Sequence, residues 1–224
     1  MKDLESNEIK PITDILVVGL GGIGSNLVDL VVPALERCKI NVNLSIMDDD
    51  IVDHSNLGHQ RYFKQEVGQN KAKCLAKRHS KLDFVNVVAL DEALSNSEQL
   101  DQYDVIIVAV DRPEPRELVH RMNIDWLDLR CQGDGWIIID SSTDSKIVDH
   151  LPQSKKPTSC QMPGAIENGN IEFGFAAVAV IGAQWLFQKM RLINGANTQL
   201  PGFRMGYLTH GEINPKFTGL MIYD

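Results

Sequence analysis

Hydrophobic residues along the chain fall into short runs that are separated by polar segments. Short apolar runs are typical of buried strands, and apolar residues three or four positions apart are typical of helices. The strands predicted from this pattern cover residues 15–18, 43–47, 85–90, 105–110 and 136–140. The predicted helices cover about residues 23–37, 68–82, 114–129 and 175–192, with Pro33 expected to kink or shorten the first. This alternation predicts an α/β fold with a mainly parallel sheet and helices on both of its faces.

The pattern changes after the last predicted strand. Residues 141–170 are polar and show no regular element over most of their length. A loop this long in a compact domain is usually functional or disordered. Beyond it, the sequence predicts a short strand at 171–173. Apolar patches at 205–208 and 220–223 predict one hairpin or edge strands, antiparallel to the rest, near the C-terminus.

Composition and charge narrow the class of protein. The chain has 224 residues, of which 43% are hydrophobic and 23% are charged, so it can bury the core of one domain. Its formal net charge of -8 argues against general nucleic-acid binding, which needs a basic face. Residues 1–10 are polar, unlike a signal peptide, and the uncharged stretch 173–188 is short for a membrane span. We therefore expect a cytoplasmic protein with no nucleic-acid or membrane partner.

The chain has four cysteines, at positions 38, 74, 131 and 160. No two of them form the C-x-x-C pair that opens a tetrathiolate zinc site, so no structural zinc is expected. In a reducing cytoplasm we expect no structural disulfides either.

A glycine-rich segment follows the first predicted strand directly. Its spacing, Gly19-x-Gly21-Gly22-x-Gly24, fits the G-x-G-x-x-G pattern of a nucleotide-binding turn. One glycine permits a sharp turn, one lets a phosphate approach the backbone, and one lets strand and helix pack closely. Asp48 ends the second predicted strand, where a carboxylate can accept hydrogen bonds from ribose hydroxyls. Alone, this pattern fits a Rossmann-like sheet that binds NAD, FAD or another nucleotide, or a merely structural glycine turn.

A dense group of polar residues follows Asp48. A carboxamide, an imidazole and an ammonium group close to a helix N-terminus favour a triphosphate site over a dinucleotide site. The alternative is a solvated loop followed by an ordinary surface helix with a basic exposed side. The members of this group are Asp50, Asp53, Ser55, Asn56, His59, Gln60, Arg61 and Lys71.

Three ordered motif blocks resemble the signature of the ubiquitin-activating enzyme superfamily. The first two are Asp48-x-Asp50-x-Val52-x-x-Ser55-Asn56-Leu57-x-x-Gln60 and Val67-Gly68-Gln69-Asn70-Lys71. The third is Asp111 followed by Arg116, at the end of the fourth predicted strand. Over about residues 15–192 the chain is similar to the single-domain bacterial members of the ThiF/MoeB type, which adenylate sulfur-carrier proteins. The resemblance implies a single ThiF-type adenylation domain over residues 1–224, with 141–170 as its crossover loop.

The resemblance also implies how ATP would be held. Asp48 would bind the ribose, and the backbone of Gly21 to Gly24 would approach the phosphates. Asn56 and Lys71 would contact the triphosphate, with the Lys71 ammonium following the charge onto pyrophosphate. The other predicted nucleotide contacts are Gly19, Gly22, Asp50, His59 and Gln60.

The implied reaction is ATP-dependent adenylation of the C-terminal glycine of a ubiquitin-like or sulfur-carrier protein. Asp111 would coordinate Mg²⁺, a cation that prefers carboxylate, water and phosphate oxygens. Gln60 and Arg116 would position the site or the acyl group. The resemblance further implies a homodimer, with a conjugating enzyme as an additional candidate partner.

Cys160 lies in the long polar loop, roughly where some members of this superfamily place a cysteine that accepts the acyl group as a thioester. Proline and glycine around it indicate an exposed loop, in which a thiol can ionise and attack. The alternatives are a remnant of a lost zinc-binding pair and a loop residue without a role. Cys131, just before the fifth predicted strand, is the weaker candidate.

Two positions depart from the superfamily pattern. The first is His59, a shorter and mostly neutral side chain where the superfamily has arginine. Either His59 contacts phosphate more weakly, or Arg61 or Arg112 supplies the missing cation. The second is the N-terminus, which has only Lys2 and Lys10 where many relatives carry an arginine that reaches a partner subunit's ATP. These departures leave a non-catalytic nucleotide-binding partner subunit as the main alternative, ahead of an NAD-dependent oxidoreductase.

Overall fold

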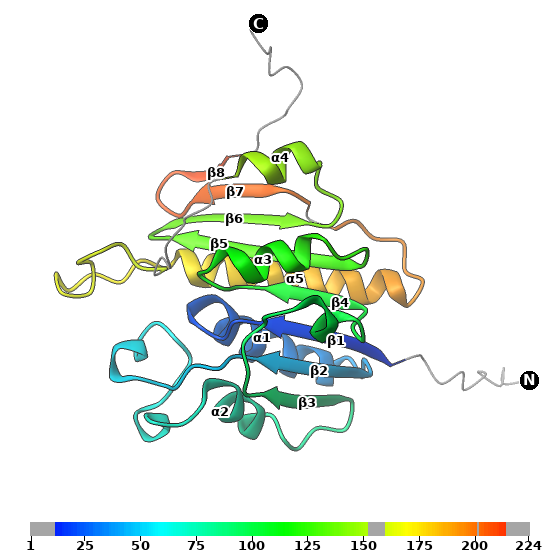
Figure 1. The fold of residues 1–224 in the computed structure, drawn as a ribbon, viewed down its shortest axis with the longest axis horizontal. Helices are drawn as coiled ribbons and strands as arrows, with labels where there is room; N and C mark the ends of the chain where they lie inside the picture. Colours follow the sequence, from blue (N-terminus) through cyan, green and yellow to red (C-terminus); the bar gives the residue numbers. More distant parts are fainter. Residues whose placement is uncertain (1–11, 152–159, 201, 214–224) are drawn as a thin grey trace, which may run out of the picture.

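A computed structural model describes residues 12–151, 160–200 and 202–213 of the chain. In these residues the backbone forms one eight-stranded sheet with the strand order β3-β2-β1-β4-β5-β6-β7-β8. Figure 1 shows this sheet with helices in front of it and behind it. The Rossmann-like α/β fold predicted from the sequence is confirmed.

Strands and helices alternate along most of the chain. The strands are β1 Thr13–Val18, β2 Val42–Met47, β3 Val85–Leu90, β4 Val105–Val108, β5 Asp125–Gln132, β6 Gly135–Asp140, β7 Arg204–Tyr207 and β8 Gly211–Ile213. The α-helices are α1 Gly22–Arg37, α2 Lys71–Arg78, α3 Pro113–His120, α4 Ser145–His150 and α5 Gly174–Ile193. Short 3-10 helices are η1 His54–Asn56, η2 Lys64–Glu66 and η3 Ser97–Leu100.

The sheet changes from parallel to antiparallel at β5. β1 pairs in parallel with β2 and β4, β2 with β3, and β4 with β5. The pairs from β5 to β8 are antiparallel and follow sequence order. Because Val18 lies opposite both Met47 and Val108, the carboxyl ends of β1, β2 and β4 reach the same edge of the sheet. The segments that follow these strands are therefore neighbours in space, which is where open α/β sheets bind ligands.

Two hydrophobic clusters cover opposite faces of the sheet. Ile15 of β1 points to the cluster covered by α1 and α5, whereas Leu16 points to the cluster beneath α3. This alternation follows from the two-residue period of a strand. Trp185 of α5 is completely buried on the first face, and its indole N–H donates to Asp140 Oδ2 at 2.8 Å. Helix α5 is thus anchored to β6 by a hydrogen bond as well as by apolar packing.

The predicted helix at 114–129 is wrong. Helix α3 ends at His120, and Asp125–Gln132 is strand β5 in the middle of the sheet. The leucines of β5 join the cluster under α1 and α5, while Asp128 faces the opposite side of the sheet and is completely buried. A buried carboxylate and the arginine two positions later hide the apolar alternation by which a strand is recognised.

Other differences concern the ends of elements. β4 ends at Val108 and not at residue 110, and α2 covers only Lys71–Arg78 of the predicted 68–82. Helix α1 is not shortened by Pro33, because it continues to Arg37.

The C-terminal part contains one confirmed and one incorrect prediction. The hairpin predicted around 205–208 is confirmed as β7 and β8. The strand predicted at 171–173 is wrong, because these residues form no strand. The segment 141–170 contains the short helix α4, and its residues 152–159 lie outside the described residues. The apolar patch at 220–223 lies outside the described residues. Within the described ranges, no helix combines the length and the apolar character that crossing a membrane requires.

Candidate nucleotide-binding site

A cavity of about 1230 Å³ opens at the carboxyl edge of the parallel strands and extends over β5, β6 and β7. It brings together almost all of the residues that the sequence predicts for the site. Among the predicted nucleotide contacts and catalytic residues, Gly24 alone does not line the cavity, because it packs beneath the glycine turn. The lining includes Gly19, Gly21, Gly22, Asp48, Asp50, Asn56, His59, Gln60, Lys71, Asp111, Arg116 and Cys160.

The glycine turn has the geometry that its spacing predicts. Gly19 has φ +88°, and a Cβ atom there would lie 2.7 Å from the Ala109 carbonyl oxygen. A Cβ atom on Gly24 would lie 1.9 Å from the Gly19 carbonyl oxygen, so the turn and the start of α1 pack too closely for any side chain. At Gly21 a Cβ atom would meet no heavy atom within 4 Å. The backbone at Gly21 therefore faces open space, so a phosphate can approach it closely.

Helix α1 begins at Gly22 beside this cavity, and no side chain of the described residues caps its first turn. The first amides of a helix lack intrahelical partners, and they form the positive end of its dipole. An anion in the cavity can accept hydrogen bonds from these amides.

Asp48 and Tyr62 hold the glycine turn from two sides. The Leu20 N–H donates to Asp48 Oδ2 at 2.6 Å, and the buried Tyr62 hydroxyl donates to the Leu20 carbonyl oxygen at 2.8 Å. The Asp50 N–H donates to Asp48 Oδ1 at 2.8 Å. Burial raises the pKa of Asp48, and the positive charge of Lys71 opposes that shift. Each carboxylate oxygen retains acceptor capacity for a ribose hydroxyl.

Lys71 is buried, and not part of an exposed basic side of α2. Its side chain is 6% exposed, and its ammonium lies 2.7 Å from Oδ2 of Asp50, whose side chain is 57% exposed. Asn70 caps α2 by accepting a hydrogen bond from the Lys73 N–H, and its amide N–H donates to the Asp48 carbonyl oxygen at 2.9 Å. This cap fixes the start of α2, and with it Lys71, relative to the end of β2.

The loop between β2 and α2 presents two polar atoms that lack partners. His59 Nδ1 and Gln60 Oε1 are buried, and neither has a hydrogen-bond partner among the described residues. Burial and the nearby Lys71 charge lower the pKa of His59, which is therefore neutral at pH 7. The Asn56 side-chain oxygen instead accepts from the Asp53 N–H at 2.9 Å and shapes η1. Two orphaned buried atoms beside a cavity fit a site that a polar ligand completes.

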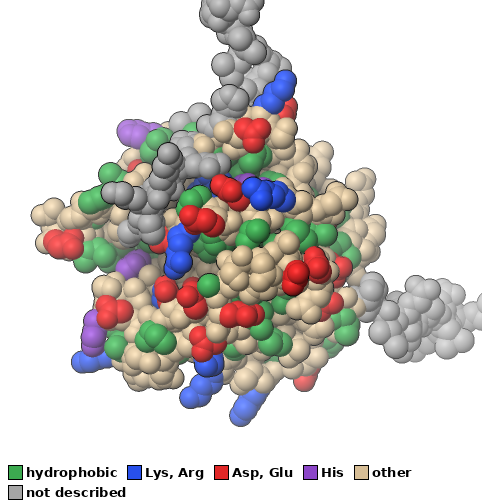
Figure 2. Space-filling view, viewed as in Figure 1, with side chains coloured by type: hydrophobic (Ala, Val, Ile, Leu, Met, Phe, Trp, Pro, Cys, Tyr) green, Lys and Arg blue, Asp and Glu red, His purple; other side chains and the backbone are tan. Residues whose placement is uncertain are grey.

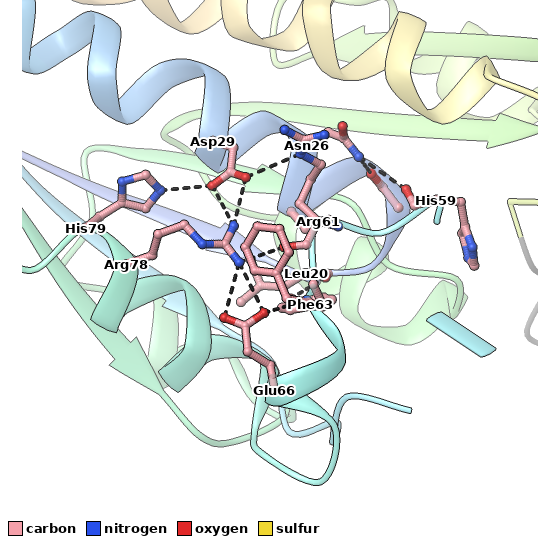
Figure 3. Close-up of polar contacts among 12 residues, drawn as sticks. Leu20, Asn26, Asp29, His59, Arg61, Phe63, Glu66, Arg78 and His79 are labelled. Carbon is pink, nitrogen blue, oxygen red and sulfur yellow. Dashed lines mark hydrogen bonds and ion pairs between the residues drawn. The ribbon is translucent and has the colours of Figure 1, made fainter. Parts of the chain in front are cut away.

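Arg61 does not supply the cation that His59 lacks. Its Nε lies 3.4 Å from Asp29 Oδ2 on α1, and it is not part of the cavity lining. Arg78 donates to Asp29 at 2.8 Å and to the Arg61 carbonyl oxygen at 2.8 Å, and so ties the loop to both helices. Figure 3 shows Arg61 and Arg78 converging on Asp29, with the His59 ring pointing away from them.

Asp111 and Arg116 follow β4 but occupy different environments. Asp111 is about half exposed at the cavity, and Nε of the neighbouring Arg112 lies 4.0 Å from its Oδ1. Arg116 is nearly buried, donates to the carbonyl oxygens of Val110 and Leu129, and forms an ion pair with Asp128. Burial and the neighbouring Arg130 lower the pKa of Arg116 to about 9, so it stays charged at pH 7. Arg116 therefore braces β4 against β5.

Asp128 and Arg130 on β5 were not predicted as site residues. Asp128 accepts from Arg130 Nη2 at 2.7 Å and Nε at 3.0 Å, and its Oδ2 lies 3.0 Å from His120 Nε2. Burial and the positive charges of Arg130 and Arg116 lower the pKa of His120 to about 4, so this histidine is neutral at pH 7. In the sequence these two charges stand two positions apart. This spacing places them on one face of the sheet only if residues 125–132 form a strand, which the sequence did not predict.

Cys160 lies against the start of α1 and beside a second thiol. It is half-buried and not exposed as predicted, and its Sγ lies 2.9 Å from the position of a Cβ atom on Gly22. Cys131 belongs to β5, where the thiol hydrogen bond with Cys160 and burial raise its pKa. The Gly133 N–H donates to the Cys160 carbonyl oxygen at 2.9 Å and holds the two segments together.

Comparison with known proteins identifies the family. A match to the ThiF family spans residues 7–210. The chain belongs to the ThiF family. Among curated proteins, it is 29% identical over 203 residues to the adenylyltransferase and sulfurtransferase UBA4 of Lodderomyces elongisporus, a match that covers 83% of this chain and 41% of UBA4. The superfamily predicted from the motif blocks is thus confirmed.

A second curated relative is matched over a shorter region. SUMO-activating enzyme subunit 2 of Dictyostelium discoideum is 36% identical over 115 residues, which is 48% of this chain and 16% of that protein. The chain therefore spans less than half the length of either relative.

Solved structures show the same fold. MccB of E. coli with ATP superimposes with a TM-score of 0.62 at 15% identity, covering 90% of this chain and 63% of MccB. PaaA gives a TM-score of 0.63 at 18% identity, covering 90% of this chain and 62% of PaaA. At such low identity these likenesses concern the fold alone.

Proposed function

We propose that this ThiF-family chain uses ATP to adenylate the C-terminal carboxylate of a carrier protein or peptide. The observation that carries the proposal is the shared cavity of the glycine turn, the start of α1, the buried Lys71 and the exposed Asp111. These groups combine an amide cradle, a buried cation and a carboxylate, which suit a triphosphate with its metal. A dinucleotide would leave Lys71 and Asp111 without a role.

The chain's residues suit ATP and Mg²⁺ as follows. The open space at Gly21 and the amides of α1 would receive phosphate oxygens, and Asp48 would receive the ribose hydroxyls. Asp111 would hold Mg²⁺, which would neutralise charge on the phosphates when it is bound. His59 Nδ1 and Gln60 Oε1 would find in the ligand the partners that they lack.

The proposed reaction is a displacement at the α-phosphorus of ATP. A carboxylate oxygen of the substrate forms a bond to this phosphorus, the bond to the bridging oxygen breaks, and pyrophosphate leaves with that electron pair. Lys71 and the amide groups of α1 stabilise the negative charge that moves onto pyrophosphate. Alignment and charge stabilisation supply the rate, because this step needs no covalent nucleophile of the protein.

The proposed substrate is a small ubiquitin-like or sulfur-carrier protein with a C-terminal glycine. The names of UBA4 and of the SUMO-activating enzyme subunit support this class. A free peptide is the second candidate, supported by the complex of MccB with MccA. We further propose a single adenylation domain over residues 1–224 with 141–170 as a crossover loop, a homodimer, and a conjugating enzyme as an additional partner.

Cys160 is proposed to accept the acyl group from the adenylate. Its thiolate would attack the acyl carbon, and AMP would leave as the new thioester forms. Its position against the first residue of α1 supports this role, because a helix N-terminus stabilises a thiolate. The hydrogen bond with Cys160 raises the pKa of Cys131, so Cys131 is the thiol that keeps its proton, and replacing each cysteine separately tests which of the two carries the acyl group.

The alternative function is a nucleotide-binding subunit that assists a catalytic partner. The observation that favours it is His59, which is buried and neutral where the superfamily has an arginine. Such a subunit is expected to bind nucleotide poorly, so micromolar affinity in a calorimetric titration with ATP and Mg²⁺ would count against it.

The decisive experiment is ATP–pyrophosphate exchange in the presence of small proteins that end in glycine. We expect exchange that depends on the carrier and is lost in Asp111→Ala. Asp101→Ala, an exposed carboxylate outside the cavity, serves as the matched control. Absence of exchange with the genuine carrier would rule out the proposed function.

A further inference from the structure

The loop between β2 and α2 is attached to the start of α1 by hydrogen bonds. The Arg61 N–H donates to the hydroxyl oxygen of the buried Ser25 at 3.0 Å. The Asn26 side-chain amide donates to the His59 carbonyl oxygen at 3.4 Å. The backbone on either side of Gln60 is therefore tied to the helix whose first residue lines the cavity.

Arg78 of α2 holds the same loop from its other side. Its Nη1 donates to Asp29 Oδ2 at 2.8 Å and to Oδ1 at 3.0 Å, and its Nη2 donates to the Arg61 carbonyl oxygen at 2.8 Å. Nη2 also lies 3.3 Å from both carboxylate oxygens of Glu66, and the guanidinium carbon lies 4.8 Å from the centre of the Phe63 ring. Figure 3 shows the Arg78 side chain between α1 and the loop. One guanidinium thus joins α1, α2 and the loop.

The hydrogen bonds around Arg78 are largely shielded from water. The side chains of Arg78, Asp29 and Glu66 are 22%, 17% and 15% exposed. Burial acts to raise the pKa of Asp29, but the hydrogen bonds from His79 and Arg78 and the charge of Arg78 lower it, so this carboxylate is ionised at pH 7. Charge-assisted hydrogen bonds away from water are stronger than those at an exposed surface. The contact between Arg78 and Asp29 is therefore a firm attachment point for the loop.

We propose that Arg78 is a positioning residue for the bound nucleotide. By joining the loop backbone to α1, it keeps His59 and Gln60 at the cavity, although Arg78 itself does not line the cavity. This inference rests on the proposed ATP site and adds to it a residue that does not touch the ligand.

The two side chains that Arg78 positions have ligand-facing atoms without a hydrogen bond. His59 Nδ1 and Gln60 Oε1 are buried, and neither has a hydrogen-bond partner among the described residues. Their positions depend instead on the loop backbone, and loops are in general more mobile than the elements that they connect. The contacts of the loop with α1 and with Arg78 therefore decide whether these atoms meet a nucleotide.

The surface charge makes the placement of groups within the cavity important. The chain has a formal net charge of -8, and Figure 2 shows acidic side chains spread across the face that carries α3. Such a surface does not attract a nucleotide from solution. Affinity for MgATP therefore depends on contacts inside the cavity, and these require that the loop and α1 keep their relative positions.

The first test compares Arg78→Lys and Arg78→Gln with the unchanged full chain. Lysine keeps the charge beside Asp29, but its single ammonium cannot reproduce the fork that reaches both Asp29 and the Arg61 carbonyl oxygen. Both variants should bind MgATP about tenfold more weakly in calorimetry, the effect of losing one or two hydrogen bonds to the ligand. Lys77→Gln is the matched control, because Lys77 is an exposed cation in the same last turn of α2.

The second test separates positioning from a general loss of structure. The same Arg78 substitutions are made in a background that carries His59→Ala and Gln60→Ala. If Arg78 acts through these two side chains, its replacement should weaken MgATP binding much less in this background. A general structural role would instead weaken binding by the same factor in both backgrounds. If Arg78→Gln does not fold, Arg78→Lys carries the comparison.

The outcomes are distinct. A factor that falls by about threefold or more in the double-alanine background supports the inference, and a smaller reduction overturns it. Binding by both Arg78 variants within about twofold of the unchanged chain also overturns it. Failure of the unchanged chain to bind MgATP would overturn the proposed function, and this inference with it.

Discussion

The parallel and the antiparallel halves of the sheet use polar residues in different ways. In the half from β3 to β4, the strands are mostly apolar, and the polar residues of the site follow the strand ends. In the half from β5 to β8, carboxylates stand within the strands and are buried, as Asp128 and Asp140 are. Both carboxylates meet partners from helices, Arg116 of α3 and Trp185 of α5.

Because of this difference, we expect activity and stability to depend on different parts of the molecule. Crossover connections in the parallel half leave the strand ends free to carry loops that shape a ligand site, so changes there should reduce activity first. Buried ionic groups at β5 are part of the core, so changes there should reduce stability as well. Four predictions test this contrast, in order of decreasing effect.

Asp128→Asn should have the largest effect, on stability. It leaves Arg116 and Arg130 without their shared carboxylate in a buried setting, and breaking a buried ion pair costs about 3–5 kcal/mol. The free energy of unfolding from urea titration measures this loss. Asp125 is on the same strand as Asp128 and pairs with Lys189 of α5, but its side chain is 41% exposed. Asp125→Asn should therefore reduce the free energy of unfolding far less than Asp128→Asn. Equal reductions would contradict the contrast between the two halves.

Lys71→Gln should reduce activity more than stability. Removing one preorganised cation from a transition state lowers the rate by about 10² to 10³. Its partner Asp50 is largely exposed and can be solvated, so the free energy of unfolding should change little. Lys73→Gln is the control, because Lys73 lies on the same helix with a side chain that is 64% exposed. A large loss of stability in Lys71→Gln would mean that a charged residue in the parallel half stabilises the core, as the buried charges at β5 do.

Stability should fall as the pH is lowered from about 6.5 to about 4 because of His120. Its pKa in the folded protein is about 4 against 6.5 for an ordinary histidine, so in this range the unfolded chain binds the proton and the folded chain does not. The expected loss between pH 7 and pH 4.5 is on the order of 2 kcal/mol. Other groups also titrate in this range, so the informative quantity is the difference from His120→Gln. That variant should lose this part of the pH dependence, and an identical pH profile would contradict the prediction.

Tyr62→Phe should have the smallest effect. It leaves the Leu20 carbonyl oxygen without the hydroxyl that donates to it, which costs about 1 kcal/mol. Because Leu20 is part of the glycine turn, we also expect weaker MgATP binding in calorimetry. Tyr103→Phe, a buried tyrosine in the other hydrophobic cluster, should leave MgATP binding unchanged. Equal binding by Tyr62→Phe and the unchanged chain would show that Asp48 alone fixes the turn.

Much of the parallel half was predictable from sequence. Four strands of this half, α1 and the glycine turn were recognised, because apolar runs and glycine spacing are local patterns. Lys71 was recognised by its motif, but its burial was not, because that depends on how Asn70 caps α2 against β2. Arg61 was a candidate cation from the sequence, but in the structure it pairs with Asp29 of α1, to which Arg78 also bonds, outside the cavity lining.

The region around β5 was not predictable in the same way. Asp128 falls at the end of the helix predicted at 114–129 and Arg130 just beyond it, and only the pairing of Asp128 with Arg116 of α3 and with Arg130 makes their burial possible. The contact between Cys131 and Cys160 joins positions 29 residues apart in the sequence through a loop that returns to the sheet. The periodicity of apolar residues reports local structure and cannot predict a contact between such distant positions.

By itself, the sequence determined the order of strands and helices in the parallel half, the nucleotide turn and the family. These features depend on residues that are close together in the chain and on backbone conformations that few residue types allow. Only the tertiary structure decided which charged residues face the cavity and which are enclosed in the core. The reason is that a buried charge is stable only beside its counterion, and the counterions here come from distant elements.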